Sequence, residues 1–173
     1  MLDAARTLML RDGLRGTTME AIAREAGVAK ATLYAQFPDK LAVFAGIVDI
    51  LLGEIGAAFQ AGMAGPGPVD QRIGAALAGQ YLALARALEG SPHAAELMSE
   101  HKRTALALED IEHGFSGEIA AALAAEGVAD AEALAHLLGA ASYGIALKTS
   151  DVAAMQAAIR LLCRRLIGPE LDP

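Results

Sequence analysis

Residues 17–40, TTMEAIAREAGVAKATLYAQFPDK, constrain the fold of this chain more than any other segment. Apolar side chains recur there at the three- and four-residue steps of a helix: Met19, Ile22, Ala23 and Ala26. Gly27 follows them, and glycine is the residue that most easily adopts the left-handed backbone of a helix end. The segment therefore predicts a short helix that stops abruptly.

The start of this helix has a capping signal. Thr17 and Glu20 stand at the T-x-x-E spacing of a capping box. This spacing predicts that the Thr17 hydroxyl accepts the backbone N–H of Glu20, while the carboxylate reaches back to the N–H of Thr17. We therefore expect the helix to begin near Thr18.

A second helix is predicted over about 29–37, with Leu33, Phe37 and the preceding Val28 on its buried side. The opposite side presents small and polar residues: Lys30, Ala31, Thr32, Ala35 and Gln36. Two short helices joined by a tight turn suit the major groove of DNA, which is wide enough to admit one helix.

The order of small, polar and apolar residues resembles the N-terminal domain of the TetR family of transcriptional regulators. Upstream, LDAARTLMLRDGLRGTT is similar to that family's first helix and turn; downstream, LYAQFPDKLAVF is similar to its recognition helix running into helix four. The resemblance covers about residues 1–48 and implies a three-helix, helix-turn-helix DNA-binding domain. It implies that residues 49–173 form a helical ligand-binding and dimerisation domain.

The resemblance also implies which side chains meet DNA. Lys30 can reach a phosphate or a guanine edge, and Gln36 can pair with an adenine edge. Tyr34 corresponds to a familiar tyrosine of the family whose hydroxyl reaches a phosphate, although its ring could instead serve only the core. The candidate DNA-binding residues are Thr18, Lys30, Ala31, Thr32, Tyr34, Ala35, Gln36 and Lys40.

The rest of the chain also has helical periodicity. We expect helices over 2–12, 39–63, 69–88, 92–102, 103–125, 131–148 and 152–167, with Asp130 and Asp151 as caps of the last two. AGPGP at 64–68 is the clearest linker, because its Gly and Pro residues cannot continue a helix. The predicted fold class is all-α.

Composition narrows the environment of the chain. Cys163 is the only cysteine, so an internal disulfide is impossible, and its apolar neighbours favour a buried thiol. The uncharged runs are shorter than the roughly 20 residues that span a bilayer, so we expect no transmembrane helix. No secretory signal is visible at the N-terminus, which makes the cytoplasm the expected compartment.

Charge is distributed unevenly. The net charge is −7, but residues 1–48 carry six Lys or Arg against five Asp or Glu, and the remainder carries eight against sixteen. An acidic body behind a near-neutral module weakens non-specific attraction to nucleic acid. We therefore expect a few well-placed cations to make the specific contacts.

The last two predicted helices carry apolar stripes that could pair with a second copy of the chain. In the resembled family such helices form a four-helix dimer interface, although packing inside one protomer uses the same periodicity. The candidate dimer residues are Leu134, Leu137, Leu138, Ala141, Ile145, Val152, Met155, Ile159, Leu162 and Leu166.

The family resemblance further implies that a small-molecule effector binds between helices of the second part. The candidate ligand-binding residues are Phe59, Met63, Tyr81, Met98, His101, His113 and Phe115. Each is an individually weak signal, because aromatic and Met side chains usually fill the core.

Other functions have less support. We expect no cofactor or metal, because no paired Cys/His spacing accompanies the histidines, and no enzyme, because no nucleophile or acid pair does. The leading hypothesis is a homodimeric, ligand-responsive repressor that an effector releases from a palindromic operator. The alternative is a protein-interaction adaptor with an inactive DNA-binding motif.

Overall fold

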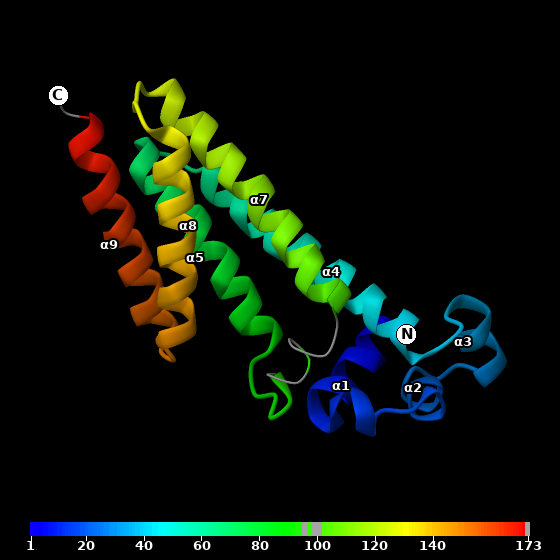
Figure 1. The fold of residues 1–173 in the computed structure, drawn as a ribbon. Coiled ribbons are helices and arrows are strands. Elements are labelled where there is room, and N and C mark those ends of the chain that lie inside the picture. The colour runs from blue at the N-terminus through cyan, green and yellow to red at the C-terminus, as the bar shows by residue number, and fades with distance from the viewer. Residues whose placement is uncertain (95–96, 98–101, 172–173) are drawn as a thin grey trace. The chain divides into compact units, whose positions relative to one another are not determined.

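The computed structural model describes residues 1–94, 97 and 102–171, and the side-chain surroundings of all of these except 102–110 and 112. Within that part of the chain it contains α-helices and no strand, which confirms the all-α fold (Figure 1). The helices are α1 (Leu2–Gly16), α2 (Met19–Glu25), α3 (Lys30–Gln36), α4 (Lys40–Met63), α5 (Val69–Ala87), α7 (Lys102–Ala125), α8 (Ala131–Lys148) and α9 (Val152–Leu171). The helix expected over 92–102 lies mostly outside the described residues.

The chain divides into two compact units. The N-terminal unit comprises Met1–Gly53 and Ala87–Leu108, and the C-terminal unit comprises Glu54–Arg86 and Glu109–Pro173. The helix α4 begins in the first unit and ends in the second. The AGPGP segment separates α4 from α5 as the sequence predicted.

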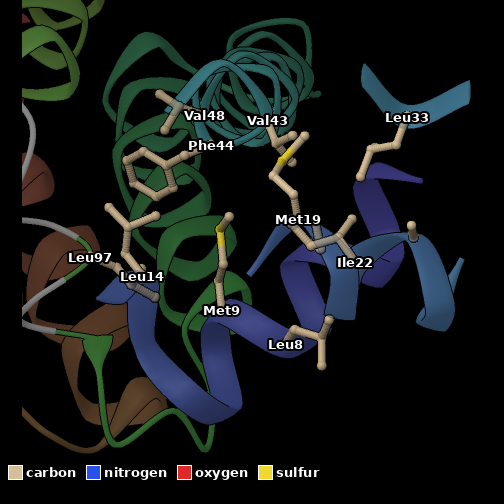
Figure 2. Close-up of a cluster of buried hydrophobic side chains, with 12 residues drawn as sticks. Leu8, Met9, Leu14, Met19, Ile22, Leu33, Val43, Phe44, Val48 and Leu97 are labelled. Atoms are coloured by element: carbon tan, nitrogen blue, oxygen red, sulfur yellow. The ribbon is translucent and has the colours of Figure 1, made fainter. Parts of the chain in front are cut away.

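The N-terminal unit is built on one apolar cluster to which α1, α2, α3 and α4 all contribute (Figure 2). Figure 2 shows Leu33 extending from α3 to the same cluster as Met19 and Ile22 of α2 and Val43 of α4. The cluster consists of Ala5, Leu8, Met9, Leu14, Met19, Ile22, Ala23, Leu33, Val43, Phe44, Val48 and Leu97. Burying a side chain the size of leucine contributes about 1.5–3 kcal/mol, so this cluster fixes the short helices against one another.

The predicted start of α2 is wrong by one residue. The N-cap is Thr18, whose hydroxyl accepts the N–H of Ala21 at 3.1 Å. Thr17 is buried, and its hydroxyl donates to the carbonyl oxygen of Gly13 at 2.8 Å. Because Gly13 has φ of 76°, the backbone of α1 breaks there, and Thr17 binds the carbonyl that this break leaves.

The C-terminal unit has its own core, in which α4 and α5 come unusually close. A Cβ on Gly62 would lie 2.2 Å from the backbone nitrogen of Ala76, so only glycine fits at this crossing. Phe59 stacks on Phe115 of α7 with ring centroids 3.9 Å apart. The helices α8 and α9 pack side by side (Figure 1).

Two further predictions concern the ends of these last helices. Asp151 caps α9, because its carboxylate accepts the N–H of Ala154 at 2.8 Å. Asp130 precedes α8 but makes no side-chain cap hydrogen bond, so the second predicted cap is wrong. Cys163 is buried as expected, and burial raises the pKa of its thiol to about 12.

The helix α4 is long and apolar enough to cross a membrane by length and composition alone. The search for uncharged runs overlooked it because Asp49 and Glu54 interrupt the sequence. Both carboxylates are exposed, whereas Phe44 and Phe59 are buried in the cores of their units. An Asp at the centre of a membrane helix costs about 2.5–3.5 kcal/mol, which disfavours a membrane span for α4.

Candidate nucleic-acid interface

The turn between α2 and α3 fixes the direction of α3. Gly27 has φ of 66°, and the N–H of Val28 donates back to the carbonyl oxygen of Ala23 at 3.0 Å. The N–H of Gly27 donates to the carbonyl oxygen of Arg24 at 3.2 Å. This pair of hydrogen bonds is a Schellman motif, which satisfies the last carbonyls of α2 and turns the chain sharply.

The helix α3 presents one buried and several exposed side chains. Leu33 is 0% exposed and anchors the helix, whereas Tyr34, the next residue, is 42% exposed. The exposed candidates on α3 are Lys30, Ala31, Thr32, Tyr34, Ala35 and Gln36. We call these six residues the α3 face. It offers an ammonium, two hydroxyls, a carboxamide and two methyl groups, the groups that bind phosphates and base edges.

Lys30 is already engaged with its neighbours. Its ammonium donates to the Glu20 carboxylate of α2 and lies 5.7 Å from the centre of the Tyr34 ring. The hydrogen bond from Lys30 lowers the pKa of Glu20, and the same bond raises the pKa of Lys30. Both groups are therefore charged at neutral pH, and Glu20 holds the ammonium beside the α3 face.

Lys40 and Thr18 border the α3 face from other elements. The Lys40 ammonium donates to the carbonyl oxygens of Thr17 at 2.9 Å and Arg15 at 3.4 Å, so it binds the end of α1. An ammonium has three N–H donors, which leaves Lys40 a donor for a further acceptor. The exposed Thr18 hydroxyl accepts from Ala21, and its own hydrogen remains available to donate.

The predicted ligand-binding residues do not all meet in one place. Tyr81, His113 and Phe115 line a cavity of about 300 Å³ in the C-terminal unit. Phe59 lies behind Phe115, against which it stacks, and Met63 does not line the cavity. Met98 and His101 lie outside the described residues.

Sequence reasoning missed most of the cavity wall. The additional lining residues are Leu77, Gln80, Ser116, Ile119, Ala135, His136, Gly139, Ala140 and Tyr143. Gln80 carried the clearest overlooked signal, because it is a carboxamide inside an otherwise apolar stretch, immediately before Tyr81. The alanines and glycines line the cavity because they are small. They carry no functional group that would mark them in the sequence as ligand-binding residues.

The geometry of α2, the turn at Gly27 and α3 is that of a helix-turn-helix, and a family model matches the same region. Residues 1–47 match the model described as bacterial regulatory proteins, tetR family. The N-terminal part of the chain thus matches the DNA-binding region of the TetR family. The proteins that this model describes are bacterial regulatory proteins.

Solved structures share the fold over nearly the whole chain. A protein described as a transcriptional regulator from Pseudomonas aeruginosa PAO1 is 18% identical, with a TM-score of 0.72 over 99% of this chain and 88% of its own. A TetR-like transcriptional regulator from Rhodococcus sp. RHA1 is 22% identical, with a TM-score of 0.69 over 96% and 93%. GusR of Salmonella enterica is 25% identical, with a TM-score of 0.65 over 96% and 93%. None of the curated proteins compared with the chain matches it.

The candidate dimer residues on α8 and α9 fall into three groups by their exposure in the protomer. Leu138, Met155 and Ile159 are buried within the protomer, where they belong to its own core. Leu137 and Val152 are exposed. The half-buried members are Leu134, Ala141, Ile145, Leu162 and Leu166. Packing of α8 on α9 uses the same periodicity that an interface would use.

Proposed function

We propose that this chain is a sequence-specific regulator of the TetR family, a repressor that a small-molecule effector releases from a palindromic operator. It acts as a homodimer in the cytoplasm. The observation that carries the proposal is the α3 face: six exposed residues on either side of the buried Leu33, which holds the helix in place. Rigid mounting of the contacting groups is what sequence discrimination requires, because a loosely held side chain adapts to any base.

The groups of the α3 face divide into two roles. Gln36 can donate to and accept from an adenine edge, and such a bidentate pair discriminates by about 1–3 kcal/mol against a wrong base. Lys30 and Tyr34, with Lys40 and Thr18 at the border, suit phosphates, which position the protein without reading sequence. Ala31 and Ala35 allow close approach and can touch a thymine methyl group.

A second copy of the chain would supply the second DNA-contacting helix. Three leucines of α8 and α9 are exposed on the surface of the protomer: Leu137 is 51%, Leu147 is 64% and Leu161 is 46% exposed. Leu137 and Leu147, with Ala140 and Gly144 between them, recur at helical steps on one side of α8. A dimer through this side would carry two α3 faces, which fit successive major grooves about 34–36 Å apart.

The regulatory step is a difference in affinity between two conformations. An effector in the C-terminal unit would favour the conformation that binds DNA less well, with a coupling of about 1–3 kcal/mol. The helix α4 supports this proposal, because it runs without interruption from Lys40 beside the α3 face to Met63 in the C-terminal unit. DNA must then weaken effector binding by the same factor.

Three exposed substitutions test the proposal. The variant Lys30→Ala, Tyr34→Ala, Gln36→Ala removes three of the four polar side chains of the α3 face without touching Leu33. We expect its affinity for duplex selected by the native protein to fall more than about tenfold, with unchanged helical content and mass in solution. Fluorescence anisotropy of a labelled duplex measures the affinity.

A charge-matched control separates specific contacts from net charge. Arg165→Ala removes one exposed cation from α9, and we expect it to leave DNA affinity nearly unchanged. Equal losses in both variants would mean that the α3 face does not contact DNA. A native protein that binds no duplex but remains dimeric would favour the adaptor function instead.

A further inference from the structure

The cavity in the C-terminal unit has walls from three helices. Leu77, Gln80 and Tyr81 come from α5, Phe115 and Ser116 from α7, and Gly139 from α8. Its volume of about 300 Å³ lies at the lower end of the range found for small-molecule sites. The cavity therefore suits a compact molecule of one or two rings better than a long chain.

One wall residue has an unmet hydrogen-bonding need. Gln80 is only 6% exposed, and its side-chain carbonyl oxygen has no hydrogen-bond partner within the described part of the chain. An unpaired acceptor in the interior is costly, and structures rarely keep one without a reason. A bound molecule that donates a hydrogen bond from the cavity would satisfy this oxygen.

The wall also limits the charge of the occupant. Among the described lining residues there is no Lys, Arg, Asp or Glu, and only His113 and His136 can carry charge. A buried carboxylate or ammonium needs an opposite charge or several hydrogen bonds to offset its lost hydration. The described wall therefore favours an uncharged molecule.

Ring surfaces dominate the remaining contacts. Phe115 stacks on Phe59 at 3.9 Å with 10° between the ring planes, which fixes Phe115 as a flat panel of the wall. Tyr81 and Tyr143 add further aromatic surface. Flat aromatic walls pack best against a flat ligand.

We propose that this cavity binds an uncharged aromatic molecule carrying a hydroxyl or N–H group, with the carbonyl oxygen of Gln80 accepting its hydrogen bond. The assignment rests on the proposed function, because it names the chemical class of the effector for that regulator. Gln80 sets the specificity for a donor, and the aromatic residues supply the affinity.

Three probes of the same ring system test the class. 2-Naphthol is uncharged and carries a donor, 2-fluoronaphthalene has nearly the same shape without a donor, and 2-naphthoate carries a negative charge. The chain has no Trp, so naphthol emission can be followed without tryptophan background. We expect 2-naphthol to bind at least about tenfold more tightly than either analogue. The affinity of each analogue is measured by its competition with 2-naphthol for the cavity.

Two substitutions locate the site. Gln80→Leu keeps the volume and removes the acceptor, so 2-naphthol should bind no more tightly than 2-fluoronaphthalene. The variant should melt at or above the native temperature, because an unpaired buried oxygen is removed. Gly139→Leu places a side chain at the cavity wall, where an added Cβ meets no atom within 4 Å, and should weaken all probes about tenfold.

The matched control is Gly117→Leu, on an exposed position of α7 that also has open space for a Cβ and does not line the cavity. It should bind 2-naphthol as the native protein does. No binding of 2-naphthol, tighter binding of 2-naphthoate, or unchanged selectivity in Gln80→Leu would each overturn the proposal.

The ligand result and the DNA result are separable. Native protein that selects a DNA sequence but fails the probe test retains the proposed function and loses this ligand class. Native protein that binds 2-naphthol through Gln80 but selects no DNA sequence retains the site and loses the regulator.

Discussion

The α3 face and the stripe on α8 follow the same helical periodicity, yet only the first was correctly divided into buried and exposed positions. Leu33 was expected on the buried side and is 0% exposed, whereas the Tyr34 hydroxyl was expected to reach a phosphate and Tyr34 is 42% exposed. Leu137 and Leu138 were expected in one interface, and they are 51% and 0% exposed. A short helix flanked by polar residues has one apolar side, whereas a long helix rich in Ala and Leu has apolar residues on both sides. Periodicity identifies the apolar sides of such a helix but does not show which side packs against the rest of the protomer.

The largest expected effect comes from substitutions at Leu137 and Leu138, which test whether these neighbours lie on opposite sides of α8. Leu138→Glu buries an unpaired carboxylate, so we expect the C-terminal unit to lose its folded structure. Leu137→Glu places the same charge on the surface and should keep native helical content while turning the dimer into a monomer. Circular dichroism and sedimentation measure the two properties. A dimeric Leu137→Glu protein would place the interface elsewhere.

The second prediction concerns the turn before α3. Gly27→Ala puts a Cβ on a residue with φ of 66°, and nothing lies within 4 Å of it, so the whole cost is backbone strain. We expect the free energy of unfolding to fall by about 1–2 kcal/mol. Gly53→Ala, at an exposed helical position that also has open space, should raise it by about 0.5–1 kcal/mol. Urea titrations of both variants provide the measurement, and equal effects would contradict a turn that depends on Gly27.

The smallest expected effect concerns Glu20. Glu20→Gln removes the carboxylate that binds Lys30 and frees the ammonium for a phosphate. We expect DNA affinity to rise about two- to fivefold, with a salt dependence steeper by up to about one unit of slope. Glu25→Gln makes the same change of charge on α2 and should have less effect. If the two variants behave alike, Glu20 acts only through net charge and does not position Lys30.

Much of the fold could be predicted from the sequence because its boundaries depend on local chemistry. Gly27 ends α2, the Asp39 carboxylate accepts the N–H of Ala42 at the start of α4, and AGPGP separates α4 from α5. The cap was wrongly assigned to Thr17 because its hydroxyl donates to the carbonyl oxygen of Gly13. The sequence pattern did not reveal that α1 is kinked at Gly13. Adjacent threonines offered two caps, and tertiary packing selected Thr18.

The α3 face could likewise be predicted, since exposure of a helix side follows from one buried leucine. The cavity could not, because it depends on which small residues face one another across α5, α7 and α8. Gly139 and Ala140 of α8 line the same cavity as Tyr81 of α5 and Phe115 of α7. Such a juxtaposition is a property of packing and not of any one segment.

The central claim is that two α3 faces on one dimer read neighbouring turns of a single duplex. Selection of bound duplexes from a random DNA pool, followed by sequencing, tests it most directly. The account predicts an enriched inverted repeat whose half-sites are about one helical turn apart, and loss of that enrichment in the Lys30→Ala, Tyr34→Ala, Gln36→Ala variant. A pool that shows no sequence preference at moderate ionic strength would contradict it.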